Sequence, residues 1–212
     1  MKFFSYESKF TQLLLKLCKG CCLGFLWLIC CIPVFTAGAA TTGLYYACFK
    51  VIREEDNGIT RLFFKGFRDN FRQSTVLWLI LLAVGALLGA DGWVLYHLYS
   101  SDANGLGVLW TILLAFLIGA AIFYVIVSLY VFPLTASVEN TSINMLKNSF
   151  LIGVHYLFCT ILVFAVHFAL VFVVVAVFTP LFLFGGGLCA LLCSFLLEPV
   201  IRKCVTPAEE EQ

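Results

Sequence analysis

The chain has 212 residues, of which 62% are hydrophobic and only 12% are charged. A soluble domain is about half apolar and about a quarter charged, so a chain of this size cannot bury so much apolar surface in a core of its own. A lipid bilayer is therefore expected to surround it. The formal net charge of +1 gives no reason to expect a nucleic-acid partner.

The first half of the chain contains an uncharged stretch that allows two arrangements. Residues 20–49 contain no Asp, Glu, Lys or Arg, and about 20 helical residues suffice to cross a hydrocarbon core of ~30 Å. In one arrangement this stretch is a single span with a kink at Pro33. In the other, residues 11–32 and 37–53 form a helical hairpin, because proline removes a backbone donor and ends a helix.

The hairpin is the favoured arrangement because it agrees with the distribution of basic residues. The N-terminus and the segment 50–72 are both rich in Lys and Arg, and basic segments tend to remain on the cytoplasmic side. The turn would run through Pro33 and Gly38, and small residues such as Gly43 would let the two helices pack closely. Pro33, Gly38 and Gly43 are therefore the predicted hinge or turn residues.

The region near residues 59–74 is expected to form an amphipathic helix at the membrane interface. Cationic residues recur at steps of four, three and four, so they share one helical face: Arg61, Lys65, Arg68 and Arg72. Aromatic residues fall on the other side: Phe63, Phe67 and Phe71. Such a helix places aromatic rings toward the acyl chains and cations toward the headgroups. It would either anchor and orient the protein or dock a cytoplasmic partner.

The rest of the chain predicts further membrane segments. Three long stretches have almost no charge: residues 73–101, where Asp91 is the exception, residues 103–138 and residues 148–197. They predict helices over the ranges 76–98, 106–132, 151–178 and 182–201, with uncharged connections near residue 102 and over 180–187.

The basic residues orient these segments. Loops 50–72 and 134–149 and the C-terminal end carry Lys and Arg, which places them and the C-terminus in the cytoplasm. The prediction is an all-α fold, a polytopic transmembrane helical bundle with five or six membrane segments. It forms a single domain over residues 1–206, followed by an acidic disordered tail over 207–212.

Few polar groups lie at membrane depth, and two of them could form a functional site. Asp91 belongs to the outer half of its predicted helix, and His167 lies near the middle of another. Ionisable groups inside a membrane are costly and often mark a pathway for an ion, a proton or a sugar. The alternative is that both side chains are satisfied by local hydrogen bonds.

The positions of the cysteines and glycines suggest that these residues serve helix packing, and they predict no cofactor site. Most of the ten cysteines lie in apolar segments, where cysteine behaves as a small hydrophobic residue. The pair Cys18-x-x-Cys21 has no second pair of ligands to complete a zinc site, so no metal site is predicted. The pairs Gly20-x-x-x-Gly24 and Gly85-x-x-x-Gly89 would let helices approach closely within the bundle.

Three stretches carry a resemblance to a known family. They are FFSYESKF at 3–10, FLWLICCIPVFTAGAATTGLYY at 25–46 and FFKGFRDNFRQS at 63–74. The chain resembles the YesL-like family, bacterial integral membrane proteins, mostly from Firmicutes, that are built around a domain of unknown function (group 624). Cleavage of a signal sequence after Ala39 is disfavoured, because it would remove many of the matching residues.

The resemblance implies a role in carbohydrate uptake, but it implies no chemical reaction and no catalytic residue. Genes of this family often lie beside those of carbohydrate ABC importers and sensor kinases, which implies an accessory component of carbohydrate uptake that docks to a permease. No catalytic residue is implied, and the enzyme motifs G-x-S-x-G, P-loop and H-E-x-x-H do not occur. We therefore expect a non-enzymatic membrane protein whose partners are the bilayer and an ABC permease. The alternative is a small transporter that uses Asp91 and His167.

Overall fold

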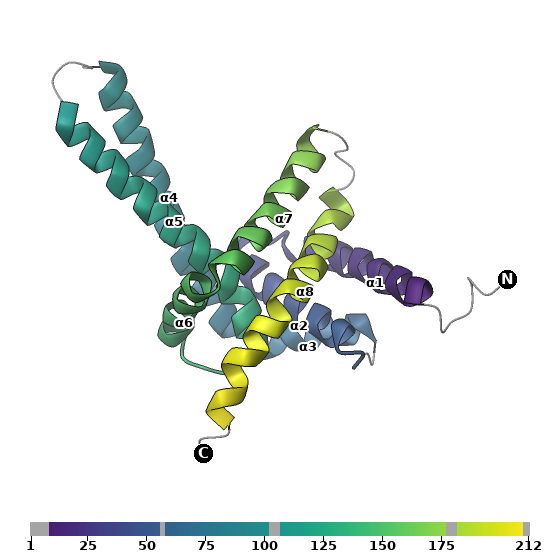
Figure 1. Cartoon of the computed structure of the whole chain (residues 1–212). Coiled ribbons are helices and arrows are strands. Elements are labelled where there is room, and N and C mark those ends of the chain that lie inside the picture. Colours follow the sequence, from purple (N-terminus) through teal and green to yellow (C-terminus); the bar gives the residue numbers. More distant parts are fainter. Residues whose placement is uncertain (1–8, 56–57, 102–106, 177–181, 210–212) are drawn as a thin grey trace.

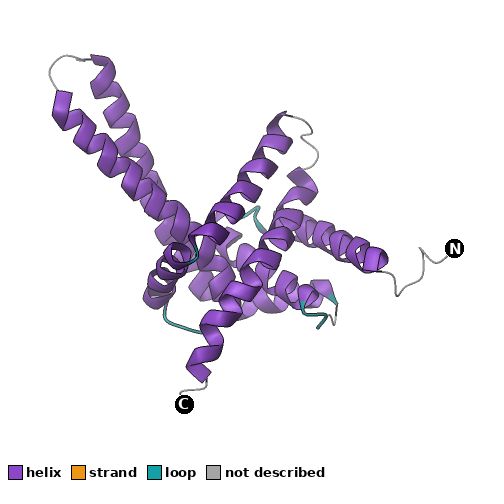
Figure 2. Ribbon diagram, in the orientation of Figure 1, coloured by secondary structure: helices purple, strands orange, loops and turns teal. Residues whose placement is uncertain are grey.

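The computed structural model describes the backbone of residues 9–55, 58–101, 107–176 and 182–209. Within these ranges the chain forms α-helices, one short 3-10 helix and no strand, as Figure 2 shows. The all-α prediction is therefore confirmed. In chain order the elements are α1 (Lys9–Cys30), η1 (Val34–Thr36), α2 (Ala37–Ile52), α3 (Ile59–Asp69), α4 (Phe71–Ser101), α5 (Gly107–Ser137), α6 (Ser142–His155), α7 (Leu157–Ala176) and α8 (Phe182–Glu209).

Five of these helices, α1, α4, α5, α7 and α8, are long and apolar enough to cross a membrane. The prediction of a polytopic helical bundle with five or six membrane segments is thus confirmed, with five candidate spans among the described residues. The 16 residues of α2 extend over about 24 Å at 1.5 Å per residue. That length is less than the ~30 Å of a hydrocarbon core.

Two helical hairpins, α4–α5 and α7–α8, diverge from a base that contains α2, α3 and α6, and α1 extends away from this base (Figure 1). Large apolar side chains remain exposed along both hairpins, among them Trp93, Phe116 and Val175. Exposed apolar side chains on this scale are expected where lipid, and not water, is the solvent.

Residues 20–49 form two antiparallel helices and not one kinked helix. The Thr36 hydroxyl donates to the carbonyls of Cys30, at 2.6 Å, and Pro33, at 2.7 Å. The Cys30 carbonyl is one of the acceptors that the end of α1 leaves without an intrahelical partner. The Trp27 indole lies 3.1 Å from the Thr41 hydroxyl near the turn. At the other end of the pair, Lys16 and Glu54 form an ion pair at 3.1 Å, so α1 and α2 run in opposite directions.

The central helix of the base is α2, which packs against α1, α3, α4, α5 and α8. Its Thr42 hydroxyl forms a buried hydrogen bond of 2.8 Å with the Ser74 hydroxyl of α4. A Cβ on Gly38 would lie 2.5 Å from the Ser74 carbonyl oxygen, and one on Gly43 would lie 2.8 Å from the Phe63 carbonyl oxygen. Pro33 lies in the turn, but Gly38 and Gly43 lie inside α2 and permit close packing there. Their prediction as hinge or turn residues is corrected accordingly.

Several predicted boundaries also differ from the structure. Helix α3 ends at Asp69, where the Asn70 side chain and backbone both donate to the Gly66 carbonyl. The predicted amphipathic helix therefore stops early, and Phe71 and Arg72 belong to α4.

The second half of the chain shows further differences. The predicted helix 151–178 is divided at Tyr156 into α6 and α7. Helix α5 continues through Pro133 to Ser137. Helix α8 continues through Glu209, so the predicted disordered tail is helical over 207–209, and residues 210–212 lie outside the described residues.

The glycine triplet over 185–187, where the expected connection 180–187 and the expected helix 182–201 overlap, lies inside α8. The reason is a close helix crossing, since a Cβ on Gly24 would lie 2.8 Å from the backbone nitrogen of Gly187. Glycine is tolerated inside α8 because only glycine allows α1 to come so near.

Candidate functional site

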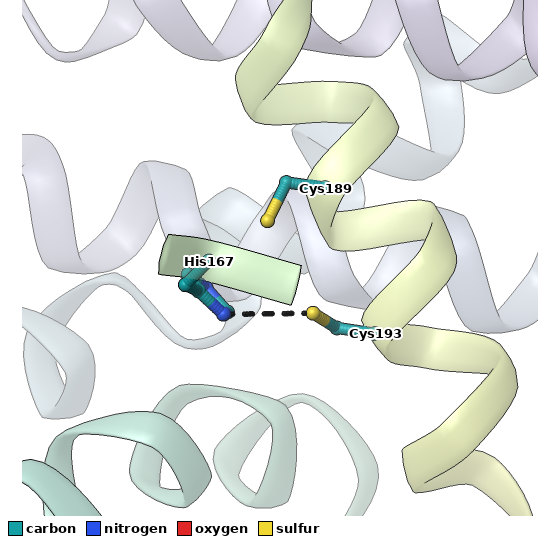
Figure 3. Close-up of side chains that lie close together, drawn as sticks. All are labelled: His167, Cys189 and Cys193. Atoms are coloured by element: carbon teal, nitrogen blue, oxygen red, sulfur yellow. Dashed lines mark hydrogen bonds between the residues drawn. The ribbon is translucent and has the colours of Figure 1, made fainter. Parts of the chain in front are cut away.

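Three side chains with metal-ligating atoms meet where α7 packs against α8. They are His167 of α7 and Cys189 and Cys193 of α8, and their ligating atoms all lie within 4.8 Å of one another (Figure 3). Residues four positions apart share a face of a helix, so both cysteines face α7. Both are buried, and His167 is partly buried.

The imidazole of His167 is held by its own helix. Its Nδ1 lies 2.9 Å from the Val163 carbonyl oxygen and 3.6 Å from the Cys193 sulfur. A carbonyl oxygen can only accept a hydrogen bond, so Nδ1 carries the proton in this arrangement. The other ring nitrogen, Nε2, then keeps its lone pair and is available as a ligand.

Further sulfur and oxygen atoms surround the cluster. Cys48 of α2 and Cys159 of α7 lie in the same region but outside the group of three, and Tyr45 of α2 approaches the Cys193 sulfur. Tyr45 and Cys48 are buried. Thiols and an imidazole in such an apolar enclosure could hold a thiophilic metal ion, because the ligand set is soft and water is largely excluded.

Sequence reasoning missed this cluster because each cysteine was interpreted separately as a small hydrophobic residue. One signal was present, since Cys189 and Cys193 are spaced to share a helical face. Their pairing with His167 depends on the register between α7 and α8, which the sequence does not provide.

The two residues of the predicted intramembrane polar site are not brought together. Asp91 is exposed on α4, which packs mainly on α5 and α2 and makes no extensive contact with α7. His167 faces α8 within the second hairpin. The hairpins diverge (Figure 1), so Asp91 and His167 form no joint site.

The predicted cationic face is present, although it extends over two helices. Arg61, Lys65 and Arg68 are exposed on α3, and Arg72 is exposed on α4. None of the four forms an ion pair with another described residue. The cations near the end of α2 differ, because they are paired: Lys16–Glu54, Lys50–Glu55 and Arg53–Glu198. The Lys50 hydrogen bond lowers the pKa of the Glu55 carboxyl.

The aromatic face of α3 is directed toward the protein and not toward lipid. Phe63 is 0% exposed, and Phe67 and Phe71 are partly buried. The Phe63 and Phe67 rings are stacked with centroids 6.3 Å apart, and Phe67 contacts Phe71 at 5.4 Å. The expectation that these rings lie among acyl chains is therefore wrong for Phe63, because α2 covers it.

A comparison with protein families assigns the first part of the chain. Residues 21–92 match the family model described as a protein of unknown function, DUF624. This part of the chain is similar to the DUF624 family. The match confirms the family that the sequence resembles. No curated protein and no solved structure matches the chain.

The DUF624 match covers the latter part of α1, the whole of α2 and α3 and most of α4. It therefore includes the α1–α2 turn and the cationic face. The cluster of His167, Cys189 and Cys193 lies beyond the matched residues. The family description carries no statement about chemistry at that cluster.

Proposed function

We propose that this DUF624 protein is a non-enzymatic accessory component of a membrane assembly and docks to its partner through a cationic surface. This docking surface consists of Arg61, Lys65, Arg68 and Arg72. The observation that carries the proposal is that all four side chains are exposed and form no ion pair within the described residues. The matching partner surface is acidic, with carboxylates that pair with these cations.

The base of the protein holds this docking surface in a fixed orientation. Phe63 is buried beneath α2, and a Cβ on Gly66 would lie 2.6 Å from the Cβ of Tyr46. Helix α3 therefore has little freedom to rotate about its axis. Pre-organised charges lose less conformational entropy on binding than charges on a mobile loop. This supports recognition of a defined partner in addition to contact with lipid headgroups.

The partner that we propose is the permease of a carbohydrate ABC importer. The support for this choice is the family resemblance, since members of the family are often encoded beside such importers. The alternative, a small transporter that uses Asp91 and His167, loses its basis because these residues lie on different hairpins. We place the docking surface in the cytoplasm from the bias of basic segments toward that side.

The test is quantitative co-purification of the importer permease with the tagged full chain from its native membranes in mild detergent. The double variant Lys65→Gln/Arg68→Gln is expected to recover roughly 5- to 30-fold less permease, because each exposed ion pair contributes about 0.5–1 kcal/mol and about 1.4 kcal/mol is tenfold in affinity. Binding of the wild-type chain should also weaken with salt.

The matched control is Lys147→Gln/Lys203→Gln, which removes the same charge from exposed positions elsewhere. It is expected to recover as much permease as the wild-type chain. Equal losses in the two double variants, or no permease with the wild-type chain, would count against docking through α3.

A further inference from the structure

We propose that His167, Cys189 and Cys193 bind one thiophilic d10 metal ion, Zn²⁺ or Cu⁺, between α7 and α8. This site is independent of the docking surface on α3. It uses a part of the chain outside the DUF624 match.

The distances within the cluster suit such an ion. Zinc binds sulfur at about 2.3 Å and nitrogen at about 2.0–2.1 Å. A trigonal arrangement with these bonds separates the ligating atoms by roughly 3.8–4.0 Å. The three atoms of the cluster already lie within 4.8 Å of one another. Small rotations of the side chains would therefore close the site around an ion, without movement of the helices.

The hydrogen bond of His167 supports a role as ligand. Metal-binding histidines commonly donate their other ring N–H to a backbone carbonyl, which fixes the tautomer and the orientation of the ring. Here Nδ1 makes such a bond, 2.9 Å long, to the Val163 oxygen. Coordination through Nε2 would preserve this bond, whereas coordination through Nδ1, which lies 3.6 Å from the Cys193 sulfur, would replace it.

The donor set selects the class of metal. Thiolate and imidazole ligands favour zinc and Cu⁺ over the hard ions Mg²⁺ and Ca²⁺. Binding converts both thiols to thiolates and releases two protons to solvent. With Zn²⁺, two thiolates and a neutral imidazole give a site of zero net charge, which lowers the cost of placing the ion among apolar helices.

The surroundings distinguish the two ions. Cu⁺ needs no ligand beyond these three, but with two thiolates and a neutral imidazole it gives a site with a net charge of −1. Zn²⁺ prefers four ligands, and the Tyr45 hydroxyl, which approaches Cys193, is the candidate for the fourth. Both ions share the same chemistry of recognition, and separate titrations identify which one binds more tightly.

The experiment uses the full chain in mild detergent with a non-thiol reductant, after removal of metal by a chelator. Zn²⁺ and Cu⁺ are titrated separately in competition with a chromophoric chelator, the Cu⁺ series without oxygen. We expect one equivalent of metal per chain in at least one series. Co²⁺ serves as a spectroscopic probe, and thiolate ligation produces a near-ultraviolet charge-transfer band that ligation by oxygen does not.

The decisive comparison is between two double variants that remove the same number of thiols. Cys189→Ser/Cys193→Ser is expected to weaken binding at least 100-fold and to abolish the charge-transfer band, because loss of a ligand exceeds the 10- to 100-fold effect of an outer-shell partner. Cys18→Ser/Cys22→Ser removes two exposed thiols of α1 and should change neither. His167→Gln should weaken binding at least tenfold. Helical circular dichroism and elution volume show that each variant is folded.

Three results would overturn the proposal. The first is that the wild-type chain binds Zn²⁺ and Cu⁺ no more tightly than the folded Cys189→Ser/Cys193→Ser variant does. The Cys18→Ser/Cys22→Ser control could lose the metal, which would place it on α1. Metal could bind without the thiolate band, which would exclude the two cysteines as ligands.

Discussion

Replacement of Gly187 by alanine is expected to destabilise the folded protein by about 3 kcal/mol. Overpacking of a close contact typically costs about 1–3 kcal/mol, and this contact involves backbone on both sides. A Cβ on Gly187 would collide with the Gly20 carbonyl oxygen and would lie 2.6 Å from the Cα of Gly24. Neither atom belongs to a flexible side chain, so α1 would have to move away from α8. The measurement is the free energy of unfolding in mixed micelles.

The matched control is Gly89→Ala on α4. No atom lies within 4 Å of a Cβ placed on Gly89, and alanine is the better helix former by about 1 kcal/mol. We expect this variant to be as stable as the wild-type chain or slightly more stable. Equal losses at the two positions would mean that α1 and α8 do not cross at these glycines.

Replacement of Phe63 by alanine is the second change with a large expected effect. The side chain is fully buried on α3, which packs mainly against α2, and its ring stacks on that of Phe67. Phenylalanine-to-alanine substitutions in cores cost about 3–5 kcal/mol, through lost burial and the cavity that remains. We expect a loss of that size in the free energy of unfolding. Binding through the cationic face should also weaken, because α3 would lose its fixed orientation.

The adjacent residue provides the comparison. Phe64 is 49% exposed, and Phe64→Ala removes the same group from a site that leaves little cavity. Its cost should be below about 1 kcal/mol. If Phe63→Ala cost no more than Phe64→Ala, the aromatic face of α3 would be directed toward lipid, as the sequence pattern alone suggests.

Composition and the distribution of charge predicted the fold class, the turn between α1 and α2, and the cationic face of α3. Long stretches without ionisable residues leave the chain no solvent other than lipid, and this identified the helical membrane class. Proline at position 33 and the basic flanks favoured two helices over one, and the structure places the turn there. The steps between Arg61, Lys65 and Arg68 identified a real helical face.

Details that depend on tertiary contacts could not be predicted from the sequence. Gly187 lies where the expected connection over 180–187 and the expected helix over 182–201 overlap, so the sequence did not decide between them. Its place inside α8 depends on the close approach of α1. Asp91 and His167 were grouped because both are polar at membrane depth, but the hairpins that carry them diverge. Likewise, the sulfur cluster exists only in the register of α7 against α8.

The most direct test of the account is the sidedness of two engineered cysteines in a chain that lacks its native ones. Asp69→Cys lies beside the cationic docking surface, and Asn104→Cys lies in the sequence between α4 and α5. A maleimide that cannot cross membranes is applied to intact cells. Asn104→Cys should react at once, and Asp69→Cys only after the membrane is opened, because α4 is expected to cross the bilayer with its basic end, at Arg72, inside. Labelling of Asp69→Cys in intact cells would contradict the account.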